Sequence, residues 1–152
     1  MSIVRKHALV NINELRPHEE IDEKHLEELL EEIVRDGILK KPVVADRETL
    51  VVIDGHHRVE ALKRIGASKI PVVLVDYGDP KIVVKSWNGS PPPSKDEVVE
   101  RALKGRLFPP KTTRHVVVEE GGEKHVSELV GEENVPLTSL GARSSRAARR
   151  AL

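Results

Sequence analysis

The groups best suited to chemistry lie at residues 54–58, Asp-Gly-His-His-Arg, directly after the valine-rich run 50–53. A glycine before a helix lets the backbone approach a ligand, and the first helical turn offers unpaired N–H groups at its positive end. Arg58 adds a guanidinium group suited to phosphate oxygens, and two histidines add donors or proton carriers. Asp54 supplies the hard oxygen that Mg²⁺ prefers. The segment therefore predicts a site for phosphate and magnesium.

The predicted phosphate-binding residues are Val52, Asp54, Gly55, His56, His57 and Arg58, with Asp54 also as the Mg²⁺ ligand. The alternative is a tight turn with two surface histidines and an arginine that pairs with a neighbouring acid. The sequence contains no P-loop motif, no dinucleotide-binding glycine fingerprint and no nucleophile elbow. These absences disfavour ordinary P-loop, protein-kinase and hydrolase designs.

A second candidate is Glu19 in the run Pro17-His18-Glu19, just before a predicted helix. A loop carboxylate can lie in a cleft and act as a general base. Because glutamates are common here and Glu20 follows directly, the alternative is a solvated carboxylate. A zinc site is excluded, because the nearby histidines lack the spacing that places two imidazoles on one helical face.

The third candidate segment is residues 111–115, which hold a lysine, two hydroxyls, an arginine and an imidazole. These donors suit the carboxylate or phosphate of a small substrate, and the alternative is a basic loop facing solvent. The substrate-binding residues predicted from this run are Lys111, Thr112, Thr113, Arg114 and His115. A chain with one Phe, one Trp and one Tyr is not expected to use its tryptophan, Trp87, only as filling.

Composition limits the classes of protein that these residues can serve. Lys plus Arg number 25 and Asp plus Glu number 25 among 152 residues, and this neutral balance makes nucleic acid an unexpected partner. The absence of cysteine excludes disulfides, thiolate zinc sites and cysteine nucleophiles. No apolar run approaches the roughly 18–20 residues of a membrane span, so we expect a soluble cytoplasmic protein without membrane contact. A charged fraction of 33% without glutamine is typical of proteins from hot environments.

The elements that must position these residues follow from hydrophobic spacing and turn signals. Helical spacing predicts a helix over 22–36, with Asp22 as N-cap and Gly37 as the stop. Two more helices are predicted after Arg58, ending at Gly66, and over 94–104. Strands are predicted over 8–12, 42–45, 50–53, 70–76, 82–85 and 116–118. Residues 116–140 are expected to pack as a closing strand and turn.

We predict one domain, residues 1–140, followed by a basic tail, residues 141–152. The tail holds four arginines and no acidic residue, and we expect it to be disordered. Its alternative role is a weak electrostatic contact with nucleic acid or a partner.

The run 15–19, the acidic helix, the run 53–58, Pro71 and Asp76-Tyr77 together resemble the ParB/sulfiredoxin-like domain. With Trp87 and the run Pro-Lys-Thr-Thr-Arg-His, they look like the archaeal free L-serine kinases. Those enzymes phosphorylate free serine to O-phospho-L-serine, which feeds cysteine synthesis. The resemblance covers residues 14–88 and 106–115. It implies an α+β fold, a single domain with a small mixed sheet and flanking helices.

The resemblance also implies roles for these residues. Glu19 would take the serine hydroxyl proton, residues 54–58 with Mg²⁺ would hold the donor phosphates, and Trp87 with residues 111–115 would bind L-serine. Longer family members insert a segment between the tryptophan and the Lys-Thr-Thr run, and its absence leaves the donor open between ATP and ADP, with ATP favoured. Sulfiredoxin is excluded because its chemistry needs a cysteine. The competing hypothesis is a ParB-like nucleotide- or DNA-binding module without kinase activity.

Overall fold

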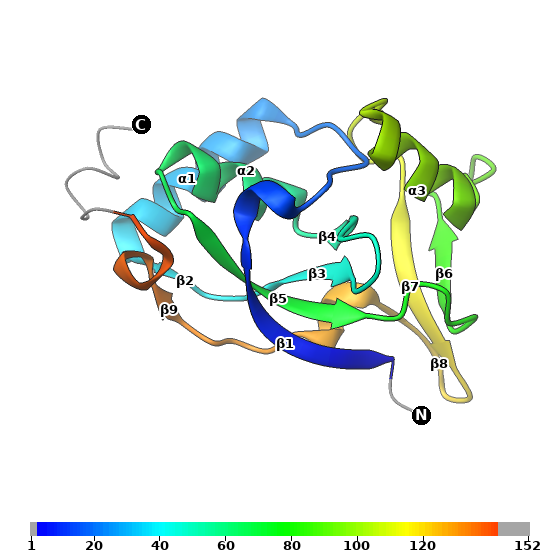
Figure 1. Cartoon of the computed structure of the whole chain (residues 1–152). Helices are drawn as coiled ribbons and strands as arrows, with labels where there is room; N and C mark the ends of the chain where they lie inside the picture. Colours follow the sequence, from blue (N-terminus) through cyan, green and yellow to red (C-terminus); the bar gives the residue numbers. More distant parts are fainter. Residues whose placement is uncertain (1–2, 143–152) are drawn as a thin grey trace.

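Three α-helices and nine short strands in three sheets make up residues 3–142, the part of the chain described by the computed structural model (Figure 1). This arrangement confirms the expected α+β fold. The helices are α1 (Glu23–Asp36), α2 (His56–Arg64) and α3 (Lys95–Lys104). The strands are β1 (Val4–Asn11), β2 (Ile38–Leu39), β3 (Val43–Asp46), β4 (Val52–Asp54), β5 (Lys69–Val75), β6 (Ile82–Lys85), β7 (Arg114–Glu119), β8 (Gly122–His125) and β9 (Val135–Pro136).

The central sheet has the strand order β1-β5-β3-β4 and is mixed. β3 and β5 run parallel, with Val44 opposite Val73, and the two outer pairings are antiparallel. All four residues of β3 are buried, which is the usual condition of a parallel strand covered on both faces. Successive residues of β3 point to opposite faces, so Val43 and Ala45 enter one core and Val44 enters the other.

The first core lies between the central sheet and the helices α1 and α2, which pack side by side on it (Figure 1). Leu26, Leu30, Ile33 and Val34 of α1 are buried, as their helical spacing predicts. The Asp22 side chain accepts hydrogen bonds from the Lys24 and His25 backbone N–H groups, and Gly37 ends the helix at a φ of 69°. Both predicted ends of this helix are therefore confirmed.

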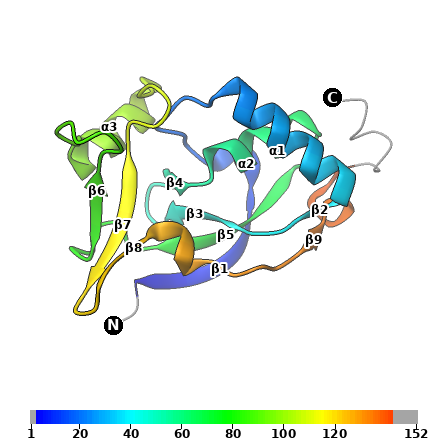
Figure 2. The same ribbon diagram turned by 180° about the vertical axis from the view of Figure 1, so that it is seen from behind.

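The second core lies on the opposite face of the central sheet, where β6, β7 and α3 stand together at one end of the molecule (Figure 2). β6, β7 and β8 form an antiparallel sheet, in which β7 is the middle strand. This core is built from valines and isoleucines together with Tyr77 and Phe108. The two cores fix β4 and β7, the strands that carry the predicted site segments.

The structure differs from the sequence-based prediction at several boundaries. α2 begins at His56, so both histidines and Arg58 lie inside its first turn. Residues 116–140 hold three strands and two 3₁₀ helices, more than the expected closing strand and turn. Ala142 is buried in the first core, whereas the sequence-based prediction places it in the basic tail. Residues 143–152 lie outside the described part of the chain. Within residues 3–142, no helix is long and apolar enough to cross a membrane.

Candidate active site

A cavity of about 650 Å³ opens where the α2 N-terminus, the start of α1 and the β7–β8 sheet meet. It brings together residues that are far apart in the chain, and five of the seven histidines of the sequence line it. Its lining residues are Glu19, His25, Leu29, Ile53, Asp54, Gly55, His56, His57, Arg58, Trp87, Lys111, Thr113, His115, His125 and Ser127. The three predicted segments therefore contribute to one cavity.

The floor of this cavity is the junction between β4 and α2. Gly55 has a φ of 105°, and a Cβ there would lie 2.5 Å from Cγ1 of Val43, so both backbone conformation and space require glycine. No side chain of the described residues caps α2, and Gly55 is its N-cap residue. The first N–H groups of α2 and the positive end of its dipole are thus available to an anion.

Arg58 and Asp54 form an ion pair at the same junction, with 3.2 Å between Nη2 and Oδ2. The Nε atom of Arg58 is buried and has no hydrogen-bond partner among the described residues. A buried donor without a partner is costly, and an anion bound beside α2 would supply the missing acceptor. The alternative interpretation of this segment expected Arg58 to pair with a neighbouring acid. Such a pair is present, and the acid is Asp54, which lines the same cavity.

His56 and His57 are hydrogen-bonded as neutral rings. The His18 backbone N–H donates to Nε2 of His56 at 3.1 Å, and the Asp22 N–H donates to Nε2 of His57 at 3.0 Å. Each ring therefore accepts at Nε2 and carries its proton on Nδ1. Burial lowers the pKa of both histidines below the usual value, with neighbouring histidines adding to the effect. The sequence alone allows His56 and His57 to act either as hydrogen-bond donors or as proton carriers. This geometry favours the role of hydrogen-bond donors.

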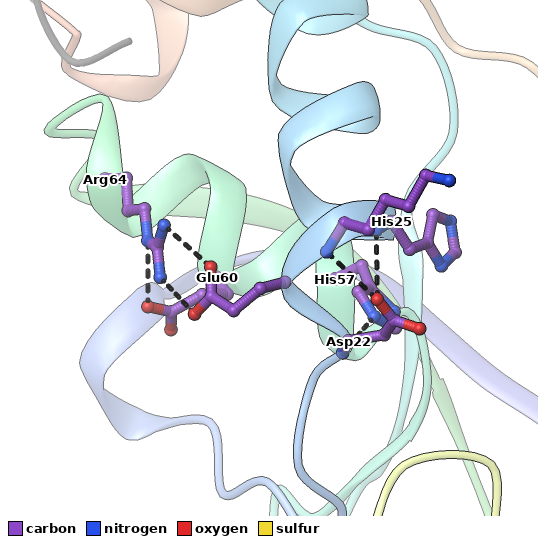
Figure 3. Close-up of polar contacts among 7 residues, drawn as sticks. Asp22, His25, His57, Glu60 and Arg64 are labelled. Carbon is purple, nitrogen blue, oxygen red and sulfur yellow. Dashed lines mark hydrogen bonds and ion pairs between the residues drawn. The ribbon is translucent and has the colours of Figure 1, made fainter.

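The bond to His57 is part of a clamp between α1 and α2 (Figure 3). Asp22 links the two helix starts, because its side chain caps α1 while its backbone N–H reaches the His57 ring. Arg64 at the end of α2 also links the two helices, because it lies 3.0 Å from a carboxylate oxygen of Glu23 on α1 and 3.5 Å from one of Glu60 on α2. The His25 ring stacks near that of His57, with 4.1 Å between centroids. The orientation of the first turn of α2 is therefore tied to α1.

Glu19 is held on the cavity wall by donors from the loop before β7. Its carboxylate accepts from the backbone N–H groups of Lys111 at 3.2 Å and Thr113 at 2.9 Å, and lies 2.9 Å from the Thr113 hydroxyl. Its own loop is fastened to Phe108 by two backbone hydrogen bonds, from Glu20 N–H to the Phe108 carbonyl and from Phe108 N–H to the His18 carbonyl. Burial raises the pKa of Glu19, and the hydrogen bonds from the loop oppose this rise. A carboxylate with a raised pKa is suited to proton transfer near neutral pH.

A second cavity of about 480 Å³ adjoins the first and shares Glu19 and His56 with it. Val52 lines this smaller cavity and not the larger one. The Val52 carbonyl accepts a hydrogen bond from Nδ1 of the buried His18 ring at 2.7 Å. Val52 therefore supports the site through its backbone.

The predicted substrate-binding residues divide into two groups. Trp87, Lys111, Thr113 and His115 line the larger cavity. Trp87 is 58% exposed and donates from its indole N–H to the Thr113 carbonyl at 3.0 Å.

Thr112 and Arg114 do not line this cavity. The Thr112 hydroxyl donates to the Pro109 carbonyl at 2.6 Å, which stabilises the loop, and Arg114 lies 3.6 Å from Glu123 on β8. His115 is buried, and the Tyr77 hydroxyl lies 2.8 Å from its Nε2. Burial raises the pKa of Tyr77 and lowers that of His115, so the tyrosine donates to a neutral ring.

Several residues of the site escaped the sequence-based prediction. His25, His125 and Ser127 line the cavity, and His18 lies buried behind Glu19. The sequence feature that could have indicated them is the number of histidines, because six of the seven lie in or beside this cavity and His7 lies elsewhere, near Glu133. No group of three or more potential ligand side chains that could hold a metal ion exists within residues 3–142. Mg²⁺ commonly uses only one or two protein carboxylates together with water and phosphate oxygens, and Asp54 fits that donor set.

Comparison with known proteins places this geometry in a family. The ATP-dependent L-serine kinase of Staphylothermus marinus is 30% identical over 133 residues, which cover 84% of this chain and 53% of that protein. The ADP-dependent L-serine kinase of Thermococcus kodakarensis is 31% identical over 105 residues, covering 66% and 43% of the two chains. This chain thus spans about half the length of the curated relatives it matches.

The structure of a free serine kinase variant in complex with ADP superposes with a TM-score of 0.72 at 18% identity, covering 90% of this chain and 95% of that one. This likeness shows a shared fold. The family model of the ParB N-terminal domain matches residues 4–86, which include Glu19, β4 and the first turn of α2. The chain belongs to the ParB N-terminal domain family.

Proposed function

We propose that this chain is a nucleotide-dependent kinase that phosphorylates free L-serine to O-phospho-L-serine. The observation that carries the proposal is the position of Glu19, which shares one cavity with the uncapped N-terminus of α2. A phosphoryl-transfer site needs a place for donor phosphates and a group that takes the acceptor proton. The relatives named as L-serine kinases support the same acceptor.

On the donor side, the N–H groups at the start of α2 and the Arg58 guanidinium would bind the phosphates of ATP or ADP. Asp54 would hold Mg²⁺ together with phosphate oxygens and water, and the ion would neutralise charge on the transferred group. Asp54 and Arg58 lie within hydrogen-bond distance of each other, so one nucleotide can engage both. The neutral Nδ1–H groups of His56 and His57 add donors without adding positive charge.

On the acceptor side, Glu19 would accept the hydroxyl proton of serine as its oxygen attacks the phosphorus. Lys111 supplies a positive charge on the same wall, and Trp87 limits the space beside it. A carboxylate of a small amino acid is best bound by a cation and by hydroxyl or N–H donors. Nucleotide and free serine are both cytoplasmic compounds, and we propose that the protein acts there.

The test is incubation of the purified chain with Mg²⁺, L-serine and either ATP or ADP, with phosphoserine detected by mass spectrometry. D-serine, L-threonine and L-homoserine in place of L-serine measure acceptor specificity, and EDTA measures the need for the metal. Phosphoserine formation with at least one nucleotide supports the proposal. Its absence from a folded protein that binds nucleotide would favour the non-catalytic ParB-like module.

The Glu19→Gln variant tests the role of the carboxylate. Loss of a general base usually lowers kcat by about 10²–10⁴-fold, whereas nucleotide binding should survive. Glu20→Gln is the matched control, because it removes a neighbouring carboxylate that does not line the larger cavity. A Glu19→Gln variant with unchanged kcat would remove Glu19 from the mechanism.

A further inference from the structure

One hydroxyl group lies between two acceptors behind the larger cavity. Oγ1 of Thr113 is 2.9 Å from Oε1 of Glu19 and 3.1 Å from Nε2 of His18. A threonine hydroxyl carries a single proton, so it can donate to only one of these two atoms at a time. In the other of these two contacts, either Glu19 or His18 must donate the proton to Oγ1 of Thr113.

The protonation state of His18 decides what that partner can supply. Nδ1 of His18 lies 2.7 Å from the Val52 carbonyl oxygen, which can only accept, so Nδ1 carries the ring proton. The ring is fully buried, and burial lowers its pKa to about 4, so it is neutral at physiological pH. Nε2 is therefore an acceptor, and it cannot donate to Thr113.

The two protonation states of Glu19 satisfy this arrangement unequally. When Glu19 is ionised, a Thr113 hydroxyl that donates to the carboxylate leaves Nε2 of His18 without a donor. A hydroxyl that donates to His18 instead leaves two oxygens, Oγ1 of Thr113 and Oε1 of Glu19, 2.9 Å apart with no proton between them. When Glu19 is protonated, its O–H donates to Oγ1 of Thr113 and the Thr113 hydroxyl donates to Nε2 of His18. The contacts among Glu19, Thr113 and His18 then each contain one proton, and buried unpaired groups are costly.

We propose that His18 is a positioning residue that strengthens Glu19 as a base, by accepting a hydrogen bond from the Thr113 hydroxyl once Glu19 has taken the proton of the substrate. The O–H bond of serine breaks, an O–H bond forms on Glu19, and the Thr113 hydroxyl rotates without breaking. No proton transfers to His18, which stays neutral throughout. The inference rests on the proposed function for the identity of the substrate, but the hydrogen-bond exchange depends only on the protonation of Glu19.

The surroundings do not provide a competing donor for Nε2 of His18 among the described residues. The His56 and His115 rings lie 4.5 Å and 5.5 Å from the His18 ring, and burial lowers the pKa of both. The backbone N–H groups of Lys111 and Thr113 donate to Glu19 whichever way the hydroxyl points. The other ionisable groups around the two cavities are Asp54, Arg58, Glu20, Glu23, His25, His57, Glu60, Lys63, Arg64, His125 and the Lys111 ammonium group.

The first test uses the wild-type protein, labelled with ¹⁵N-histidine and ¹³C-glutamate and titrated by NMR. We expect the ¹⁵N shift of His18 Nε2 to change with the same midpoint as the Glu19 carboxyl, while staying within the range of a neutral ring. Glu19→Gln assigns the carboxyl signal and should abolish the step. A His18 Nε2 signal that is constant through the Glu19 titration overturns the proposal, whether or not the protein phosphorylates serine.

The second test compares two substitutions of His18. His18→Asn keeps a donor near the Val52 carbonyl and removes the acceptor, whereas His18→Gln keeps an acceptor near the Nε2 position. Losing one hydrogen bond to the protonated state should lower the Glu19 midpoint by about half to one pH unit in His18→Asn. The acidic limb of the kcat–pH profile should move with it, and the plateau kcat should fall severalfold.

His18→Gln should keep the limb close to its wild-type position. A purely structural role for His18 would lower activity in both variants without moving the limb, and that result would overturn the proposal. If wild-type protein makes no phosphoserine, the proposed function fails, and the NMR titration still decides the role of His18.

Discussion

Replacing Arg58 by alanine tests whether residues 54–58 bind the nucleotide phosphates, as proposed. A hydrogen bond to a charged group typically contributes about 1.5–3 kcal/mol, which corresponds to about a ten- to hundredfold weaker nucleotide Kd. Two features of the structure favour the upper part of this range. The Nε atom of Arg58 is buried without a hydrogen-bond partner among the described residues, and loss of the guanidinium would leave Asp54 as an uncompensated negative charge beside a bound nucleotide.

Calorimetric titration with ADP, with and without Mg²⁺, separates these contributions. In Mg²⁺-free buffer, adding Asp54→Ala to Arg58→Ala should recover part of the lost affinity, because the repulsion disappears. With Mg²⁺ present the same addition should not help, because Asp54 is then needed to hold the ion. Arg35→Ala is the matched control, since Arg35 also pairs with an aspartate, Asp36, but lies on the exposed side of α1. A folded Arg58→Ala protein whose Kd stays within about threefold of wild type would place the nucleotide elsewhere.

Three further outcomes are expected. Asp22→Ala removes the side chain that caps α1, so Tm should fall by about 2–4 °C in a thermal melt, and an unchanged Tm would show that the cap does not stabilise the helix. Burial lowers the pKa of His18 from 6.5 to about 4, so the unfolded chain binds more protons between these values and stability must decrease as pH falls through this window. This ring alone accounts for about 3 kcal/mol, and the His56 and His115 rings, whose pKa values burial also lowers, add to the decrease. Urea unfolding at pH 7.5, 5.5 and 4.5 measures the summed decrease, and a flat profile is the contrary result. Deleting residues 143–152 removes four arginines and spares the buried Ala142. Serine phosphorylation should persist, whereas any affinity for nucleic acid should decrease. Loss of activity in the folded truncated protein would place part of the site in the tail.

The helix α1 and the turn before α2 could be predicted from the sequence, because the features that specify them lie close together in the chain. The spacing of Leu26, Leu30 and Ile33, with Asp22 and Gly37 at the ends, specifies α1 almost residue by residue. Glycine, arginine and histidine between a valine run and a helix likewise indicate a turn with an anion-binding helix start. These features depend on residues that are close in sequence, and the structure keeps them close.

The rest of the site depends on contacts over long sequence separations, for which the sequence has no local signal. His18 is an unremarkable loop residue until β4 supplies the Val52 carbonyl and the loop before β7 supplies Thr113. Gly121 and Gly122, where the turn after β7 meets the start of β8, are visible in the sequence, but nothing near His125 shows that His125 reaches the cavity. Conversely, Thr112 has the right chemistry for substrate binding, yet its hydroxyl is bonded to Pro109.

The double burial of β3 has a consequence for how the molecule opens over time. Val44 and Ala45 have partner strands on both edges, and their strand has cores on both faces, so their amide hydrogens should exchange with solvent only when the whole domain unfolds. β4 is hydrogen-bonded directly to this strand and leads into α2, so the turn proposed to bind phosphate is attached to the part of the chain expected to open most slowly. The exposed Trp87 lies on a segment without such neighbours, and its amides should exchange much earlier. Deuterium uptake should therefore be slow in β3 and β4 on one side of the cavity and fast in the segment around Trp87 on the other side.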